Sequence, residues 1–538
     1  DKPEFTMYLP GRGGNLRLGV RAGEGWTGAK WLNDAEKIEA RYRPGGMIYE
    51  VHDPLLGANG VLQVEVYALA ATEGLIVKAQ GRGIGENVEL LWAYGGVNGQ
   101  RGSRDGDIGT ERVPISQYFQ LSPDFCKGNV FQAGEGAFTL KSTPATIFGR
   151  MPGKVELADA RQWGTPAGLF GSVKGEAAAL PVVVGHAALP AGQPLYLSLQ
   201  KLAAGATADL TTYQEAGGDP ATRPAGALLP PFAAGELPRV FTEAEAHFKA
   251  LRDRVKIDTP DPYINAAAGA LNVAADAIWD EPQQAVMHGA IAWRTKLLGW
   301  RGPYAMDALG WHDRAEKDFS YWATRQNTKP IPDKIPPADE SANLSRNEAG
   351  LHSNGDMSNS HYDMNLVHID AVFRHLLWTG DLEFARKEWP VIQRHLAWEK
   401  RLFRREYGAD KLPLYEGYAA IWASDDLEYD GGGAAHASAY NYYQNMMAGR
   451  LAKLLGEDPA PYEQEAALIL KGMHEYLWLP EEGNFAEFRD YLGQQRAHPA
   501  AALWSVYHTI DSQVPTPQEA YEMTRYLDAM PHIPVRGE

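Results

Sequence analysis

The pattern of apolar residues changes once along this chain, near residue 235. Before this point, short runs such as residues 60–68 and 74–79 alternate apolar with polar residues and are separated by glycines. Such alternation is typical of strands with one buried face. After residue 241 the apolar residues recur with the spacing of amphipathic helices. Because 538 residues are also too many for one core, we predict a multidomain β + α fold with the strands first.

The strand-rich part, residues 1–235, is predicted to be an antiparallel β-sandwich domain, since many short strands at this spacing indicate a sandwich. Residues 236–260 are interpreted as a linker and a linking helix, and residues 261–538 as the helical domain. Helices are expected there at about 263–280, 303–325, 361–379, 382–405, 435–456, 460–478, 499–509 and 516–529.

Several of these helices are joined by short turns that contain glycine. Thr379–Asp381 joins two of them and Leu455–Pro459 joins another two, with the glycine as the C-terminal cap in each turn. Repeated helical hairpins of this length build either a solenoid or a closed ring. The sequence has no fixed-period repeat, which favours the ring.

Composition excludes several classes of partner and cofactor. The net charge of -17 argues against nucleic acid and anionic membranes, because phosphate groups are bound by clustered Lys and Arg. Cys126 is the single cysteine, so we predict no disulfide framework, no zinc site built from paired cysteines, and no other metal or cofactor. No stretch has the apolar length of a membrane span. The first residue, Asp1, suggests a mature periplasmic or extracellular chain, although a chain cut at this position would look the same.

A loop rich in carboxylates lies between two predicted helices. Residues 421–430 contain four carboxylates and Trp422, and Gly431–Gly433 follow them. Cleavage of a glycosidic bond needs an acid for the leaving oxygen, and an aromatic face suits a sugar ring. The alternative is a solvated acidic loop next to a glycine helix cap.

Two short motifs resemble a known superfamily. Val255–Asn265, which contains Thr-Pro-Asp, resembles the segment that opens the (α/α)6 barrel of six-hairpin glycoside hydrolases and disaccharide phosphorylases. Leu298–Arg301 resembles an element of the first inner loop in phosphorylases and α-L-rhamnosidases, although Gly302 stands where those proteins often have an aspartate. The resemblance covers roughly residues 240–538. It implies an N-terminal β-sandwich followed by an (α/α)6 barrel, as in glucosidase- and trehalase-type enzymes.

The chain as a whole is similar to a family of large secreted bacterial proteins of unassigned function, through the run Tyr8–Leu16. A closed ring of six hairpins needs twelve helices, and the pattern gives about eight. The barrel is therefore expected to be incomplete in this chain, with a second segment or chain completing it. In the related enzymes the general base lies on a late helix, so we expect the base outside these residues.

Three clusters ahead of inner helices are the predicted site. In the first, Arg301 and Asp307 are expected to hold sugar hydroxyls and Trp300 to stack on a ring; the alternative is an Arg-Asp pair that fixes the first hairpin. The second is a dense polar run whose members are candidate substrate contacts or helix caps, and its one histidine does not force a metal. The predicted substrate-binding residues are Trp300, Arg301, Tyr304, Asp307, Asp356, His361, Tyr362, Asp363, Asn365 and Trp422.

The third cluster is the acidic loop, whose position resembles that of the loop supplying the general acid in glucosidase-, trehalase- and phosphorylase-type barrels. Asp425 or Asp426 is the predicted acid and Glu416 the next candidate. Adjacent carboxylates beside Trp422 would raise the pKa of the acid. Glu487, in a later turn, is interpreted as a rim contact or a structural residue.

These observations predict an inverting glycoside hydrolase that acts on an oligosaccharide from a plant or microbial polysaccharide. The alternatives are a disaccharide phosphorylase of the same fold, a polysaccharide lyase, and a carbohydrate-binding protein without catalytic activity. The inner loops have no clear His-Arg-Lys cluster for phosphate, and helical-barrel lyases place the helices before the sandwich, so both enzymes are less favoured.

Overall fold

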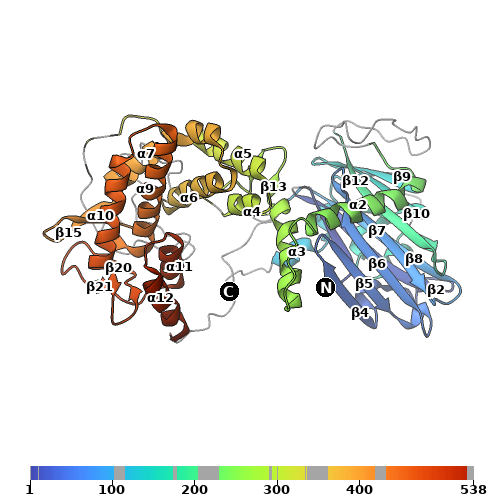
Figure 1. Cartoon of the computed structure of the whole chain (residues 1–538). Helices are drawn as coiled ribbons and strands as arrows, with labels where there is room; N and C mark the ends of the chain where they lie inside the picture. Colours follow the sequence, from blue (N-terminus) through green and yellow to red (C-terminus); the bar gives the residue numbers. More distant parts are fainter. Residues whose placement is uncertain are drawn as a thin grey trace. The chain divides into compact units, whose positions relative to one another are not determined.

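The computed structural model describes residues 2–9, 11–101, 115–173, 178–203, 230–289, 294–299, 301–331, 333, 335, 362–417 and 432–529. The chain forms two compact units (Figure 1). Unit 1 comprises Asp1–Pro282 and Gly289–Arg294, and unit 2 comprises Gln283–His288 and Thr295–Glu538.

Unit 1 contains a sheet of 12 strands in the order β1-β2-β8-β11-β10-β12-β7-β6-β5-β4, with β3 beside β2 and β9 beside β10. Neighbouring strands are antiparallel. The strands are β1 (Glu4–Tyr8), β2 (Arg12–Ala22), β3 (Lys30–Trp31), β4 (Lys37–Arg43), β5 (Gly46–His52), β6 (Val61–Ala68), β7 (Gly74–Arg82), β8 (Val88–Val97), β9 (Val130–Lys141), β10 (Thr146–Asp159), β11 (Pro181–Ala188) and β12 (Pro194–Leu202).

The strands form one curled sheet, so the predicted sandwich of two separate layers is not confirmed. The reason is β10, which is 14 residues long and belongs to both halves. Its residues 146–150 pair with β12 and β9, and its residues 155–159 pair with β11. Between these stretches lie Pro152, which has no backbone N–H to donate, and Gly153, whose φ of 81° few other residues adopt. The strand therefore passes from one half of the sheet to the other through an irregularity in the pairing between Arg150 and Lys154.

The two halves of the curled sheet share one core. Leu16, Leu18 and Val20 of β2 alternate along the strand and pack in the same cluster as Leu62 of β6 and Val77 of β7. This is the period of two that the sequence predicted.

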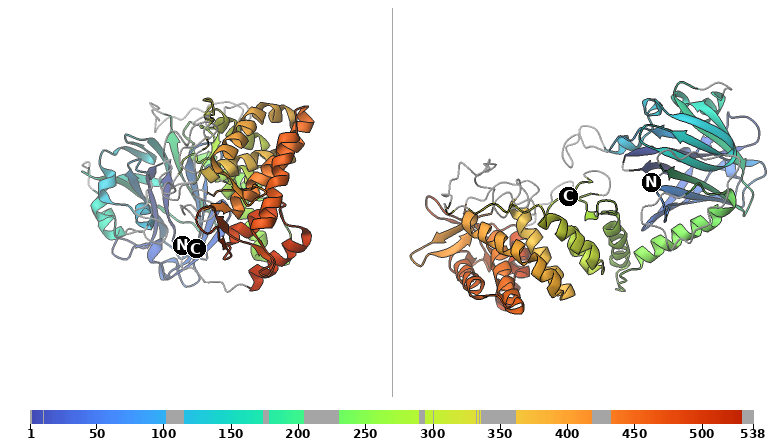
Figure 2. Two further views of the ribbon diagram at one scale, coloured as in Figure 1. Left: turned by 90° about the vertical axis from the view of Figure 1, so that its left-hand side faces the viewer. Right: turned by 90° about the horizontal axis from the view of Figure 1, so that it is seen from above.

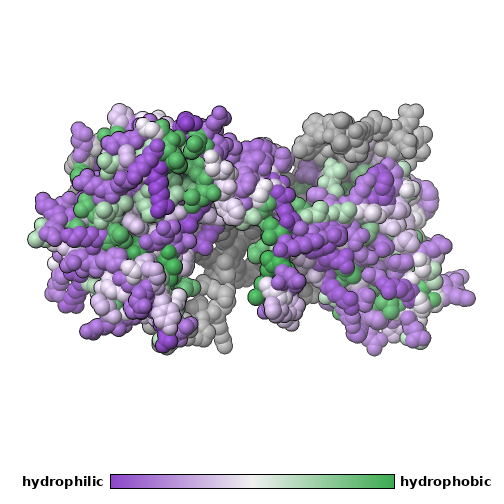
Figure 3. All heavy atoms as spheres, in the orientation of Figure 1, coloured by the Kyte–Doolittle hydropathy of each residue, from purple (hydrophilic) through white to green (hydrophobic). Residues whose placement is uncertain are grey.

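Helix α2 (Leu237–Arg252) covers part of the outer face of the sheet. Phe241 packs edge-on against Tyr67 of β6, with the ring centroids 5.5 Å apart, and Val240 joins the same buried cluster. Figure 2 (right) shows this helix running along the sheet. Helix α3 (Pro262–Ala277) follows it, and its side chains Ile264 and Leu271 are 51% and 68% exposed. Figure 3 shows hydrophobic side chains over α3.

Unit 2 is built from helical hairpins. In the described residues these are α4 (Gly302–Ala308) with α5 (His312–Ala323), α6 (Tyr362–Thr379) with α7 (Leu382–Phe403), α9 (Ala435–Leu455) with α10 (Ala460–Tyr476), and α11 (Leu503–Asp511) with α12 (Pro517–Ala529). The first helices of the hairpins, α4, α6, α9 and α11, pack in sequence against one another (Figures 1 and 2). We call these four helices the inner row. A closed ring of six hairpins is not seen in the described part of the chain.

The predicted helices are present, with one difference. The segment predicted as one helix over 303–325 is two helices, α4 and α5, because Gly310 adopts a φ of 70° between them. The predicted turn at Thr379–Asp381 holds Gly380 with a φ of 64°, and the Asp381 carboxylate caps α7 by accepting from two backbone N–H groups. None of the described helices is long and apolar enough to cross a membrane.

Short strand pairs occupy the connections that precede α9 and α11. They are β15 (Arg404–Tyr407) with β16 (Leu412–Tyr415), β18 (Trp478–Leu479) with β19 (Asn484–Phe485), and β17 (Gly432–Ala434) with β20 (Phe488–Asp490) and β21 (Ala497–His498). Because β17 pairs with β20, the connection before α9 and the connection before α11 lie side by side. They frame one end of the inner row.

Glu388 of α7 is a buried carboxylate with an unusual pKa. Its side chain is 1% exposed, and neither carboxylate oxygen has a hydrogen-bond partner among the described residues. Burial raises the pKa of Glu388 to about 7. The folded state therefore keeps a proton between about pH 4.5 and 7 that the unfolded state releases, and the free energy of unfolding falls as pH rises through this window.

We expect Glu388→Gln to remove this pH dependence. At pH 8 the variant should be more stable than the parent chain by about 1 to 3 kcal/mol, whereas near pH 5 the two should be alike. Thermal unfolding between pH 5 and 8 measures the difference. Glu383→Gln, on an exposed position of the same helix, is the matched control and should leave the pH profile unchanged. If stability depended on pH in the same way in Glu388→Gln and in the parent, the raised pKa of Glu388 would be contradicted.

Candidate functional site

Side chains from three helices of the inner row meet near the N-terminal ends of α4 and α9 and the middle of the short helix α11. We name this group the inner-helix cluster: Arg301 and Tyr304 at the start of α4, His436 and Tyr440 at the start of α9, and Tyr507 and His508 of α11. These helices begin after long connections, whereas their C-terminal ends lead into short turns. The cluster therefore lies at the end of unit 2 where the connecting loops gather.

Arg301 is the cation of the cluster. It precedes the first residue of α4, and its Nη2 donates to the Tyr507 hydroxyl at 2.9 Å while the guanidinium lies 5.8 Å from the centre of that ring. Arg301 is exposed. A planar guanidinium held against a tyrosine presents directional donors to a ligand that carries hydroxyl or carboxylate oxygens.

Tyr304 is tied to a buried carboxylate of α6. Its hydroxyl donates to Asp370 Oδ2 at 2.7 Å, and Arg374 Nε lies 3.4 Å from the same oxygen. Nη2 of Arg374 lies 2.8 Å from Oδ2 of Asp511, on α11. Burial raises the pKa of Asp370 to about 6, against the opposing effect of Arg374. This chain of contacts joins α4, α6 and α11 directly below the cluster.

His508 is an uncharged histidine within the aromatic part of the cluster. Burial, and then the proximity of His436 and Arg301, lowers the pKa of His508 to about 2. Its ring lies 4.8 Å from Tyr440 and 4.2 Å from Tyr507, measured between centroids. Tyr440 and His508 are buried and Tyr507 is half-buried, so Tyr507 is the ring of this group on which a sugar C–H face could stack.

Glu487 binds the beginnings of two inner helices. Its carboxylate accepts from Ala502 N at 2.7 Å and from Trp504 Nε1 at 2.8 Å, at the start of α11, while its carbonyl oxygen accepts from Ala435 N at the start of α9. Negative charge is favourable at helix N-termini, where backbone N–H groups lack helical partners. Of the two interpretations of Glu487, this geometry favours the structural one.

The ends of the acidic loop lie at the start of α9. Glu416 and Gly433 form an isolated antiparallel bridge, and a Cβ on Gly417 would lie 2.9 Å from His436 Cε1, so that the backbone there packs on the histidine ring. The Glu416 side chain is buried, with Oε2 2.8 Å from Nη2 of Arg405. Residues 418–431 lie outside the described residues.

The structure brings Arg301 and Tyr304 together at the cluster, and it locates the other predicted residues as follows. Asn365 is fully buried on α6. Asp307 faces two histidines, His312 and His375, and Arg301 contacts Tyr507, so the Arg301–Asp307 pair considered as the alternative is not among these contacts. Outside the described residues lie Trp300, Asp356, His361, Trp422, Asp425 and Asp426, together with the side chains of Tyr362 and Asp363.

Four cluster members escaped the sequence analysis, namely His436, Tyr440, Tyr507 and His508. All four lie inside helices, where histidine and tyrosine are read as ordinary members of an amphipathic pattern. A usable signal was their position in the first two turns of helices that follow long polar connections.

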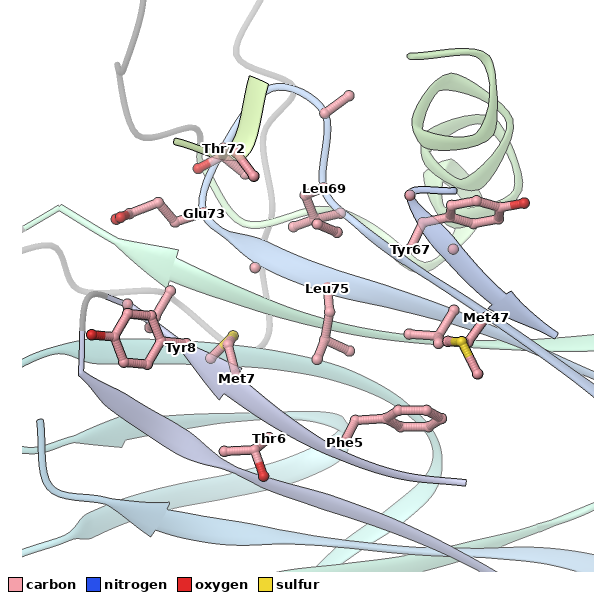
Figure 4. Close-up of a pocket in the computed structure, with 18 of the residues that line it drawn as sticks. Phe5, Thr6, Met7, Tyr8, Met47, Tyr67, Leu69, Thr72, Glu73 and Leu75 are labelled. Atoms are coloured by element: carbon pink, nitrogen blue, oxygen red, sulfur yellow. The ribbon is translucent and has the colours of Figure 1, made fainter. Parts of the chain in front are cut away.

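A cavity of about 930 Å³ in unit 1 is a second candidate site (Figure 4). Its lining is largely apolar, with Phe5, Met47 and Leu75 among the side chains. Three carboxylates line the cavity: Glu4 and Glu73 have the cationic partners Arg17 and Lys201, and Asp276 is the third. Because most of the other lining residues are apolar, the cavity suits an apolar ligand, and the inner-helix cluster is the stronger candidate for a polar ligand.

We expect Tyr304→Phe to act through stability, because the hydroxyl is already committed to buried Asp370. Loss of this donor should lower the free energy of unfolding by about 1 to 3 kcal/mol. Urea denaturation measures the change. Tyr442→Phe is the control, since that hydroxyl on α9 has no hydrogen-bond partner in the described part of the chain. A weaker substrate affinity with unchanged stability would instead identify Tyr304 as a substrate contact.

Residues 9–219 match the model of a domain of unknown function (DUF4450), which is less than half of the chain. No curated protein matches the sequence.

Solved structures with some similarity include a bacterial glucoamylase complexed with acarbose, at 9% identity and a TM-score of 0.48, covering 89% of this chain and 64% of that chain. A rhamnosidase from Klebsiella oxytoca with rhamnose bound has 11% identity and a TM-score of 0.37, covering 98% and 83%. A GH63 mannosylglycerate hydrolase from Thermus thermophilus has 14% identity and a TM-score of 0.30, covering 47% and 75%. The present chain thus spans less than two thirds of the glucoamylase.

Proposed function

We propose that this chain belongs to a glycoside hydrolase that cleaves, with inversion, an oligosaccharide derived from a plant or microbial polysaccharide. The observation that carries the proposal is the location of both ends of the acidic loop at the start of α9, beside the inner-helix cluster. A loop of carboxylates and a tryptophan next to aromatic rings and an arginine contains the groups that glycoside cleavage requires.

In this proposal Asp425 or Asp426 is the general acid that protonates the leaving oxygen. Two adjacent carboxylates repel each other when both are charged, and a neighbouring tryptophan reduces solvation, so both effects favour a protonated acid near neutral pH. Glu416 ranks behind them, because its buried carboxylate already faces Arg405. An inverting enzyme also needs a base about 6.5 to 9.5 Å from the acid, which activates water.

We assign that base to the segment or chain that would complete the barrel. The exposed apolar residues Ile264 and Leu271 of α3 support such a segment, because a soluble protein rarely leaves a contiguous apolar helix face uncovered. Helix α3 directly follows the Thr-Pro-Asp segment that resembles the opening of (α/α)6 barrels.

For substrate binding we assign Arg301 to sugar hydroxyls and the half-buried ring of Tyr507 to stacking, with Trp300 and Trp422 as further contacts. Arg301 donates in fixed directions, and the two tyrosines flank a neutral histidine. We also propose a periplasmic or extracellular location, where polysaccharide fragments are met.

A phosphorylase is a weaker candidate, because it needs a cationic pocket for phosphate. In the described part of the cluster, the Arg301 guanidinium supplies positive charge for a phosphate. His508, whose pKa is about 2, adds no positive charge at neutral pH. The anomer of the product and the dependence on phosphate separate the candidates.

The substrate class is tested by incubating the protein with a panel of plant and microbial polysaccharides and oligosaccharides and following the products by proton NMR. Release of a reducing sugar with inverted anomeric configuration is the expected result. An unsaturated uronate would replace the hydrolase by a lyase, and turnover that requires phosphate would replace it by a phosphorylase. Binding of a glycan without turnover would leave a carbohydrate-binding protein.

We expect Asp425→Asn or Asp426→Asn to reduce kcat by about 10²- to 10⁴-fold, the usual contribution of general acid catalysis. Asp430→Asn, in the same loop but without an assigned role, is the control and should retain most of the activity. Steady-state rates on an active substrate, with circular dichroism to verify folding, provide the comparison. Full activity in both Asp425→Asn and Asp426→Asn would contradict the assignment of the general acid to this loop.

A further inference from the structure

Three potential metal ligands converge in unit 2, away from the inner-helix cluster. They are Asp307 near the end of α4, His312 at the first position of α5, and His375 near the end of α6. We propose that these residues bind a divalent transition metal ion, for which Zn²⁺ is the best match. This proposal is independent of the glycosidase proposal.

The geometry fits one ion. Asp307 Oδ1 lies 2.8 Å from Nδ1 of His312 and 2.8 Å from Nδ1 of His375, and the three ligand atoms lie within 4.8 Å of one another. Zinc is bound by nitrogen and oxygen at about 2.0 to 2.2 Å, which sets tetrahedral ligands roughly 3.3 Å apart. Small rotations of the three side chains therefore suffice to place an ion between them.

The charge balance favours a cation. Asp307 is 2% exposed, and its carboxylate has the two imidazoles as its partners among the described residues. A buried carboxylate is costly without a cation close to it. A divalent ion would supply positive charge and use a ring nitrogen of each histidine as a ligand, the role in which histidine is the commonest side chain.

The surroundings resemble those of a three-ligand metal site with one open position. The ring of His375 packs edge-on against Phe319 at 5.4 Å and Phe384 at 5.1 Å, so apolar side chains enclose one side of the group. The His312 side chain is 41% exposed, which gives an ion a route of entry and leaves room for a water ligand.

The position would allow a bound ion to link two hairpins. His375 lies ten residues beyond Asn365 on α6, which corresponds to about 15 Å along the helix at 1.5 Å per residue. An ion here would join the α4–α5 turn, where Gly310 breaks the helix, to the far end of α6. The three ligands come from three helices, so binding would hold the first two hairpins together.

The test uses the protein after treatment with a chelator and its removal. Isothermal titration with Zn²⁺ should give about one ion per chain, Co²⁺ should produce the visible absorption of a low-coordinate nitrogen and oxygen site, and Zn²⁺ should raise the Tm. His312→Ala should weaken Zn²⁺ binding by roughly 10- to 100-fold or more and abolish the Tm shift. Because the His312 side chain is 41% exposed, we expect the His312→Ala variant to fold.

His498→Ala is the matched control. His498 is 44% exposed and pairs with Asp490 at 2.9 Å, without a third ligand in the described residues, so this variant should bind Zn²⁺ like the parent. Asp307→Asn, checked by circular dichroism, gives a second loss of binding without changing side-chain size. Absence of stoichiometric Zn²⁺ binding by the parent, or unchanged affinity in both His312→Ala and Asp307→Asn, would overturn the proposal.

Discussion

Unit 2 depends on how the free N–H groups at the starts of its inner helices are satisfied, and Glu487 does this for two helices at once. Its carboxylate accepts from the backbone N–H of Ala502 and the indole N–H of Trp504 at α11, and its carbonyl accepts from the backbone N–H of Ala435 at α9. Without such partners, buried helix ends would carry uncompensated donors. The same contact sets the spacing of α9 and α11, and this spacing brings Tyr440 next to His508.

Local signals in the sequence were sufficient for the order of strands and helices and for most helices, but not for the short strand pairs of unit 2 or for the pairing of the sheet. The turn around Gly380 and the helices on either side of it were predicted to within two residues, because periodicity and helix caps are local properties. The single sheet was not predicted, because its continuity depends on β10 pairing with β12, β9 and β11. Which strands pair across such distances in the sequence is decided by tertiary packing.

The same contrast between local signals and long-range packing applies to the candidate site. Arg301 and Tyr304 were predicted because they follow a recognisable loop motif, whereas His436 and His508 are 72 residues apart in two helices and meet only when those helices pack. The Asp307–His375 contact likewise joins residues 68 positions apart, with no short spacing motif to indicate it. Functional residues in loops can thus be read from sequence more readily than residues brought together by helix packing.

The two ends of the inner row differ in chemistry because they differ in backbone. The N-terminal ends present unpaired N–H groups and long connections, which favour carboxylates and accommodate a ligand-binding loop. The other ends close in short turns, where the Asp307, His312 and His375 side chains meet with little free chain between α4 and α5. A short turn holds side chains more rigidly than a long loop does, and rigid donors suit an ion that demands fixed bond lengths. The long connections, by contrast, can vary in sequence without moving the helices, so under the proposed function the choice of sugar would change there while the contacts at the opposite ends preserve the fold.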